Sequence, residues 1–186
     1  LFLGVIISCS PKTQIDLLLI NASIISVESG VANQSLVILI NGDRIFKTGG
    51  DSLLFRYKGK TEIDANSAFI LPGLWDNHVH FGGAEYIDEN EHLLPLFLAF
   101  GVTSVRDAAG DIPLEVLKWR DEIANGNRIG PRIFTSGPKI EGINSIWPGD
   151  LEVGSEIELD RALDSLKKLK VDFIKITDNA LSAELF

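Results

Sequence analysis

Short apolar runs broken by polar residues dominate the first third of the chain. Residues 15–26 are mostly apolar and rich in isoleucine, and residues 35–49 form two strand-like runs around Asn41-Gly42. Asparagine and glycine both tolerate the positive φ angles that a tight hairpin needs. No convincing helical period occurs in this part of the chain. Residues 15–72 are therefore predicted to form a small β unit.

After this β unit, apolar strand candidates alternate with helix candidates. The predicted strands lie within residues 73–81, 101–110, 131–140 and 171–179, and the predicted helices within residues 89–100, 112–126 and 156–170. The helices carry apolar residues at three- and four-residue spacing: Leu114, Leu117 and Ile123, or Leu159, Leu163, Leu166 and Leu169. Strand-helix repetition implies parallel strands joined by right-handed crossovers.

This alternation predicts an α/β fold, either half of a (β/α)8 barrel or a doubly wound sheet. No phosphate-binding glycine pattern follows the first strand, which disfavours a nucleotide-binding sheet. The net charge of −9 and the lack of a basic run argue against nucleic acid as a partner. A single cysteine excludes an internal disulfide framework.

Residues 1–14 are predicted to be a leader remnant and linker. The chain lacks methionine, so Leu1 is not expected to be the natural start, and a polar-apolar helical pattern that begins at the C-terminus predicts that this end is cut too. The initial apolar run is far shorter than the roughly 20 residues that span a bilayer. Ile6-Ile7-Ser8-Cys9 resembles a bacterial lipobox, which predicts a lipid anchor on Cys9 and an exported protein of the periplasm or outer membrane. A buried strand with an incidental cysteine is the alternative.

Two of the three histidines lie one residue apart, just before Gly82-Gly83. Residues i and i+2 of a strand face the same side, so Asp76, His78 and His80 share one face. The two imidazoles can then converge on one metal ion. The pair would lie at the C-terminal end of the first parallel strand, where barrel enzymes place their active sites. Two hydrogen-bonded structural histidines are the alternative.

A lysine stands in the middle of the last predicted strand. Phe173, Lys175 and Thr177 would face one side, toward a barrel interior. Burying a lysine is costly unless it is paired, and burial favours the neutral amine. A neutral amine can react with carbon dioxide to form a carbamate, an anionic oxygen ligand that can bridge two metals. Pairing with Asp172 or Asp178, or access to solvent, is the alternative.

Three segments in this order and spacing resemble the amidohydrolase superfamily of metal-dependent hydrolases: LPGLWDNHVHF, GVTSVRDAAG and DFIKI. The branch related to imidazolonepropionase and the Xaa-Pro dipeptidases is the most similar. The resemblance covers nearly the whole chain from about residue 15. It implies an α/β fold in which residues 73–186 form the first half, strands one to four, of a TIM-like (β/α)8 barrel. Residues 15–72 would be part of a small β-sandwich domain.

The resemblance assigns His78 and His80 as ligands of the more buried metal and Lys175 as a carbamylated bridging ligand. The implied cofactor is one or two divalent ions, zinc above all, with manganese, iron, cobalt and nickel also compatible. The family completes its site with two histidines from strands five and six and a general-base aspartate from strand eight. These are expected beyond Phe186.

Further residues carry weaker assignments. Asp76 would support the ligands. Arg106 and Asp107 would line the site or form a structural salt bridge. Trp147 would be a substrate-facing wall or a hydrophobic anchor of its loop. His92, within a helix pattern, is predicted to be a surface histidine.

The implied function is metal-dependent hydrolysis of C–N bonds in small amide, cyclic amide or dipeptide substrates, by metal-activated water. The chain alone is expected to be inactive. A deaminase on the same scaffold is one alternative, which Lys175 disfavours. A surface-anchored binding lipoprotein that has lost catalysis is another. The sequence leaves the substrate and a homo-oligomeric state open.

Overall fold

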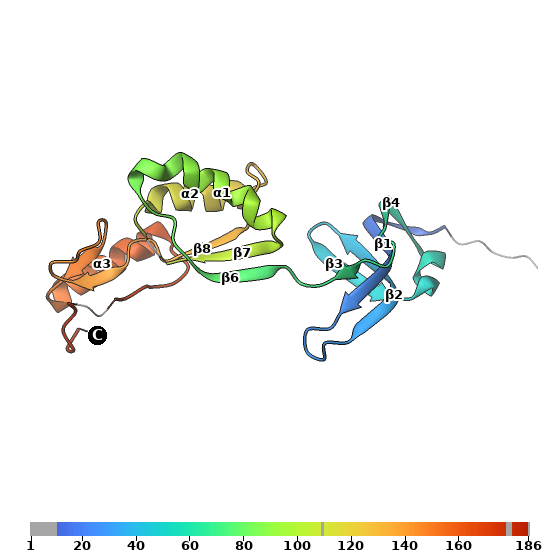
Figure 1. The fold of residues 1–186 in the computed structure, drawn as a ribbon, viewed down its shortest axis with the longest axis horizontal. Coiled ribbons are helices and arrows are strands. Elements are labelled where there is room, and N and C mark those ends of the chain that lie inside the picture. Colours follow the sequence, from blue (N-terminus) through green and yellow to red (C-terminus); the bar gives the residue numbers. More distant parts are fainter. Residues whose placement is uncertain (1–10, 109, 178–179, 186) are drawn as a thin grey trace, which may run out of the picture. The chain divides into compact units, whose positions relative to one another are not determined.

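The computed structural model describes residues 11–108, 110–177 and 180–185, and the chain divides into two compact units between Pro72 and Gly73 (Figure 1). The strands are β1 (Thr13–Ile25), β2 (Ala32–Asn41), β3 (Arg44–Gly49), β4 (Tyr57–Asp64), β5 (Phe69–Ile70), β6 (Leu74–Val79), β7 (Val102–Asp107), β8 (Arg132–Thr135), β9 (Ile140–Gly142) and β10 (Leu151–Val153). The helices are α1 (Ile87–Ala99), α2 (Pro113–Ala124) and α3 (Glu156–Leu169), with short 3₁₀ turns at Asp51–Phe55 and Ala84–Tyr86. Within the described ranges, each helix is too short or too polar to cross a membrane.

The first unit is one mixed sheet with the strand order β3-β2-β1-β4, and β5 also pairs with β1. Strands β1, β2 and β3 are antiparallel neighbours, whereas β4 and β5 run parallel to β1. Its core is Ile15, Leu18, Val37 and Leu39, covered by Leu53 from the 3₁₀ turn. The predicted β unit is confirmed. The residues described here form a single sheet, so a second layer of a sandwich is not among them.

The predicted hairpin is confirmed between β2 and β3. Asn41 pairs with Arg44, so Gly42 and Asp43 form the two-residue turn. Gly42 has a φ of 60°, which a residue with a side chain adopts at a cost. Asn41 itself belongs to the strand.

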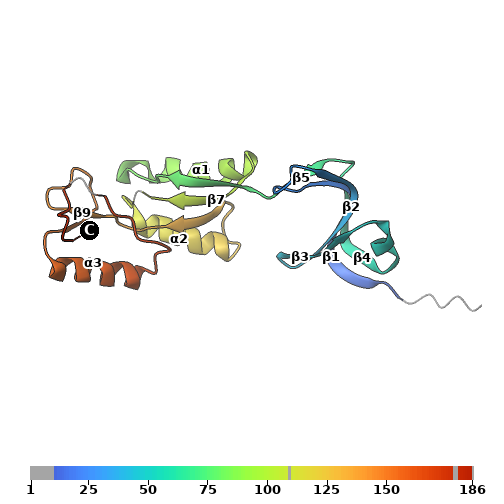
Figure 2. The same cartoon turned by 90° about the horizontal axis from the view of Figure 1, so that it is seen from below.

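The second unit is built on the parallel sheet β6-β7-β8. Helices α1 and α2 lie side by side over one face of this sheet (Figures 1 and 2). Val79, Val105 and Ile133 project from the three strands into a core with Leu94 of α1 and Trp119 of α2. The predicted strand-helix alternation with parallel strands is confirmed for these elements.

The predicted apolar stripe of α2 is confirmed for Leu117 and Ile123 but not for Leu114. Leu114 is 66% exposed, whereas Val116 and Trp119 are almost completely buried. The Trp119 ring meets the Phe81 ring edge-on, with centroids 5.9 Å apart. The large side chain at position 119 therefore sets which face of the helix points to the sheet. In α3, the predicted stripe of Leu159, Leu163, Leu166 and Leu169 is confirmed, since all four are buried or half-buried.

The predicted fourth strand, residues 171–179, does not form a regular ladder in its described part. Ile176 makes an isolated parallel bridge with Ile140. Near the start of the segment, the Asp172 N–H donates to the Thr135 carbonyl at 2.9 Å. The segment therefore lies beside β8 and β9 but joins each through few backbone bonds.

The ladder of residues 171–177 is irregular because the neighbouring segment, residues 131–140, is itself interrupted. The run predicted as one strand over residues 131–140 is split into β8 and β9. Gly137 has a φ of 58°, and Pro138 has no N–H to donate to a ladder. The strand prediction missed this break because apolar residues, Ile133-Phe134 and Ile140, occur on both sides of it.

Helix α3 begins with a capping box. The Ser155 hydroxyl oxygen accepts from the Glu158 N–H at 3.4 Å, and the hydroxyl lies 2.9 Å from Glu158 Oε2. Glu158 also accepts from the Gly154 N–H at 2.9 Å. Because these bonds favour the carboxylate, they hold the pKa of Glu158 below its ordinary value.

We expect Ser155→Ala to lower the free energy of unfolding by about 1 kcal/mol, the usual cost of losing an N-cap. Ser155→Thr keeps the hydroxyl and should cost clearly less. Urea denaturation of the two variants and the wild type measures the difference. Equal losses in both variants would show that the hydroxyl is not the stabilising group.

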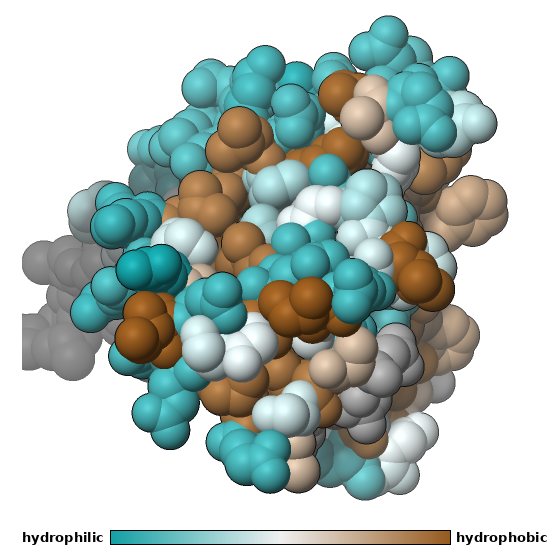
Figure 3. Space-filling model, turned by 90° about the vertical axis from the view of Figure 1, so that its left-hand side faces the viewer, coloured by the Kyte–Doolittle hydropathy of each residue, from teal (hydrophilic) through white to brown (hydrophobic). Residues whose placement is uncertain are grey.

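Several large apolar side chains of the second unit face solvent. They lie between polar ones on the face that Figure 3 presents. An apolar groove of about 250 Å³ is lined by Leu93, Leu96, Phe97, Phe100 and Val102. Contiguous apolar surface of this kind is typical of a region that packs against other protein.

Candidate metal centre

The rings of His78 and His80 converge at the end of β6. Their Nε2 atoms are 2.9 Å apart, and the ring centroids 4.9 Å apart. When two nitrogens bind the same zinc ion at about 2.0–2.1 Å and the N–Zn–N angle is near 90°, the nitrogens lie about 3 Å apart. An N–H···N hydrogen bond between the rings has the same separation. The separation is therefore compatible with a shared metal ion and with a hydrogen-bonded pair.

The face on which these rings lie follows from the strand. Val79, between the two histidines, belongs to the core under α1 and α2. Alternation along the strand then turns His78 and His80 to the opposite face, and both are exposed. Within the described residues, that face of the sheet has no covering helix (Figures 1 and 2).

Local hydrogen bonds hold the backbone around the pair. The Asp76 carboxylate accepts from the His78 N–H at 3.1 Å. Beyond His80, the buried Asn90 side chain donates to the carbonyls of Gly82 at 2.9 Å and Tyr86 at 2.8 Å. Asp76 is thus placed to support a ligand backbone, and its assigned role stays a prediction. Asn90 was missed because its position inside a helix pattern gave no sign of burial.

Lys175 is half-buried in the segment beside β9. Its carbonyl accepts from the Ile140 N–H at 2.9 Å, which fixes its backbone. Two residues earlier, the Phe173 ring lies under the Arg106 guanidinium, with the central carbon 4.5 Å from the ring centroid. By alternation, Arg106 lies on the face opposite Val105, the same face as the histidines, and its contact with the Phe173 ring places that ring on this face too. Metal binding by Lys175 stays a prediction.

Arg106 and Asp107 point to opposite sides of the sheet. Asp107 is completely buried, and its carboxylate accepts from the Phe81 N–H at 3.1 Å and from the Thr135 hydroxyl at 2.8 Å. This carboxylate joins the ends of three strands. Arg106 is exposed on the side of the histidines. The predicted pocket role of both residues stays a prediction.

The loop after β8 holds a buried ion pair. Lys139 Nζ lies 2.9 Å from Asp150 Oδ1, and the two side chains are 9% and 2% exposed. The Trp147 ring lies over this ammonium, 5.1 Å from Nζ to the ring centroid, and the residue is 52% exposed. Trp147 is thus fixed on one side and open on the other. Its role as a substrate-facing wall stays a prediction.

Glu141 is a second buried carboxylate in this region. Burial raises its pKa, but the Thr177 side chain, the N–H groups of Gly142 and Ala180, and nearby Lys139 together hold the pKa below the ordinary value. A depressed pKa stabilises the fold above the unfolded-state pKa, and this stability is lost as the pH falls through the folded-state pKa. The sequence did not single out Glu141, because the residue follows a break between strands.

The remaining predicted residues are placed as follows. His92 is exposed on α1, as predicted. Cys9 and Asp178 lie outside the described residues. In the part of the chain that the structure describes, histidine, cysteine, aspartate and glutamate side chains form no metal-binding group of three or more. The geometry therefore brings together two candidate ligands, His78 and His80, and metal binding by them stays a prediction.

Comparison with known proteins identifies relatives of the chain. No family model matches it. The curated enamidase of Eubacterium barkeri is 31% identical over 67 residues, which are 36% of this chain and 15% of the enamidase. A solved structure from Bifidobacterium longum, assigned as a prolidase, is 26% identical with a TM-score of 0.73, covering 87% of this chain and 40% of that chain. A Xaa-Pro dipeptidase with methionine bound in its active site is 25% identical with a TM-score of 0.69, covering 89% and 48%.

The chain spans less than half the length of each of these proteins. Within that span the agreement is broad, since both solved structures match more than four-fifths of the chain. The order of a β unit followed by parallel strands and helices is the same order that the sequence motifs predicted. The chain is similar to proteins of the amidohydrolase superfamily, and among them to the prolidases and Xaa-Pro dipeptidases.

Proposed function

We propose that the complete protein is a metal-dependent hydrolase of C–N bonds in small amide, cyclic amide or dipeptide substrates. The observation that carries this proposal is the convergence of the His78 and His80 Nε2 atoms, 2.9 Å apart, at the end of β6. The relationship to prolidases and an enamidase supports the same chemistry. A divalent ion held there would supply Lewis-acid polarisation of the scissile carbonyl and acidification of a water molecule.

The fold proposal goes with the functional one. We infer that the second unit is half of a (β/α)8 barrel, with the segment beside β9 as its fourth strand. The uncovered face of β6-β7-β8 would then be the barrel interior. Its stacked Trp75 and Phe134 rings, 5.0 Å apart at their centroids, suit a position in a barrel interior.

Each candidate residue of this chain would have a separate role in the site. His78 and His80 would hold one ion, and Lys175, as a carbamate, would provide the bridging oxygen ligand. Asp76 keeps the His78 backbone in place through its bond to the N–H. The exposed side of Trp147 would form part of the wall against which a substrate side chain packs.

The test uses the complete protein as its gene encodes it, purified, stripped with a chelator and reloaded with zinc. Hydrolysis is measured on a panel of Xaa-Pro dipeptides, N-acyl amino acids and cyclic amides, with and without bicarbonate during reloading. Metal-dependent hydrolysis of at least one class supports the proposal. A bicarbonate requirement for full activity supports the carbamate on Lys175. A protein that takes up no metal and hydrolyses none of the classes would refute the proposal.

A further inference from the structure

A continuous chain of polar contacts crosses the C-terminal ends of β6, β7 and β8. It starts at Phe81, the residue after His80. The Phe81 N–H donates to Asp107 Oδ1 at 3.1 Å. Asp107 Oδ2 accepts from the Thr135 hydroxyl at 2.8 Å. Asp107 and Thr135 are both 0% exposed. Bonds inside a dry core are stronger than the same bonds in water, so this part of the chain is held firmly.

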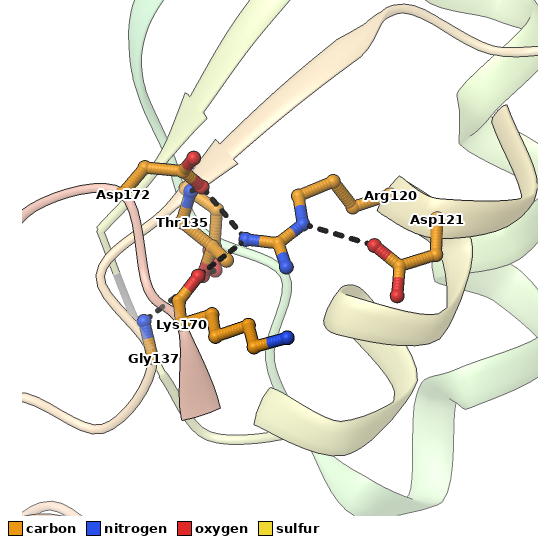
Figure 4. Close-up of polar contacts among 7 residues, drawn as sticks. Arg120, Asp121, Thr135, Gly137, Lys170 and Asp172 are labelled. Atoms are coloured by element: carbon orange, nitrogen blue, oxygen red, sulfur yellow. Dashed lines mark hydrogen bonds and ion pairs between the residues drawn. The ribbon is translucent and has the colours of Figure 1, made fainter. Parts of the chain in front are cut away.

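Thr135 continues the contacts to the next segment. Its hydroxyl oxygen accepts from the Gly137 N–H at 3.0 Å. Its backbone N–H donates to Asp172 Oδ2 at 2.9 Å, and its carbonyl accepts from the Asp172 N–H at 2.9 Å. Figure 4 shows Asp172 and Thr135 facing each other in this way.

The last residue in this series of contacts is Arg120, which lies on helix α2. Its Nη1 atom donates to Asp172 Oδ2 at 3.1 Å and to the Lys170 carbonyl at 2.9 Å (Figure 4). The Arg120 and Asp172 side chains are 18% and 30% exposed. This pair fixes the start of the segment that carries Lys175 three residues later.

We propose that Asp107, Thr135 and Asp172 are positioning residues that set the histidine pair relative to Lys175. This inference rests on the proposed function. At one end of this series of contacts, Asp107 binds the backbone of Phe81, next to His80. At the other end, Asp172 begins the segment that carries Lys175. That segment has few ladder bonds of its own, so side-chain contacts must fix its place. None of the three residues needs to touch a metal ion or a substrate.

The decisive variant is Thr135→Val in the complete protein, which keeps the side-chain shape and removes the hydroxyl. Groups that hydrogen-bond directly to a metal ligand typically contribute 10- to 100-fold to metal affinity, and Thr135 acts further away, through Asp107. We therefore expect zinc affinity, measured by competition with a chromogenic chelator, to fall by about tenfold, the lower end of that range. Thr135→Ser restores a hydroxyl and should recover most of the affinity. Ser165→Ala, which removes a hydroxyl bonded to the Ala162 carbonyl on α3, should leave the affinity unchanged.

Asp172→Asn provides a second test at the more exposed end of the chain, in case Thr135→Val does not fold. It weakens the Arg120 contact, and we expect roughly a tenfold loss of zinc affinity. Wild-type affinity in a folded Thr135→Val protein would overturn the inference but leave the proposed function intact. If Thr135→Val does not fold, wild-type zinc affinity in Asp172→Asn would overturn the inference and leave the proposed function intact. A wild-type protein that binds no zinc would instead overturn the proposed function, and the inference with it.

Discussion

His78→Ala in the complete protein should remove one bound metal ion and lower kcat/KM by about 10³-fold or more. The Nε2 atoms of His78 and His80 are 2.9 Å apart, so loss of one ring leaves a single nitrogen at this position. One imidazole cannot hold a zinc-like ion that needs three or four protein ligands. Polarisation by a metal contributes several kcal/mol to such reactions, and each 1.36 kcal/mol is a factor of ten in rate. Metal content by plasma mass spectrometry and steady-state kinetics measure the two effects.

His92→Ala is the matched control for this experiment. It removes an imidazole that is exposed on α1, away from the strand ends. Surface substitutions of this kind stay within about 0.5 kcal/mol, so metal content and kcat/KM should change little. Full metal content and normal kinetics in His78→Ala would show that the histidine pair is structural and that the centre lies elsewhere.

The sequence predicted the repeating elements well because their signals are local. The succession of strand and helix candidates located β6 and β7, and the leucine spacing in α3 matched its buried face. The prediction was wrong where one residue outweighed a pattern. Leu114 had the right spacing, but Trp119 and Val116 took the core face of α2 because they fill the space against Phe81 and the sheet. Similarly, Gly137 and Pro138 broke a run that reads as one strand.

The candidate site was predictable to the same extent. His78 and His80 share a face because the strand period is two, and this needs no knowledge of the rest of the fold. The contacts of Asp107 with Phe81 and Thr135 join residues 26 and 28 positions apart in the sequence. Such pairs are created by the register of parallel strands, which a single sequence does not specify. The supporting residue Thr135 was therefore missed, and the contacts of Asp107 with Phe81 and Thr135 were not predicted.

The loop after β8 contains a buried ion pair that the sequence did not predict. Lys139 and Asp150 lie eleven positions apart and become a buried pair only because β10 folds back beside β9. Ser145 adds a hydroxyl bond to Asp150 Oδ2 at 2.5 Å, and the Trp147 ring lies over the lysine. The whole loop is thereby organised around one charge pair. A loop held in this way can present Trp147 in a fixed orientation.

Lys139→Met should therefore lower the free energy of unfolding by about 3–5 kcal/mol, because it leaves the Asp150 carboxylate buried without its cation. The double variant Lys139→Met/Asp150→Asn carries no unpaired charge and should regain much of this loss. Urea denaturation followed by tryptophan fluorescence is measured on four proteins, the wild type, Lys139→Met, Asp150→Asn and the double variant, which together complete a double-mutant cycle. Lys60→Met is the control: the Lys60–Asp16 pair is 2.6 Å long, but its side chains are 63% and 41% exposed, so the loss should be at most about 1 kcal/mol. Similar small losses in Lys139→Met and Lys60→Met would mean that the loop is open to water, and Trp147 would then lack a fixed orientation.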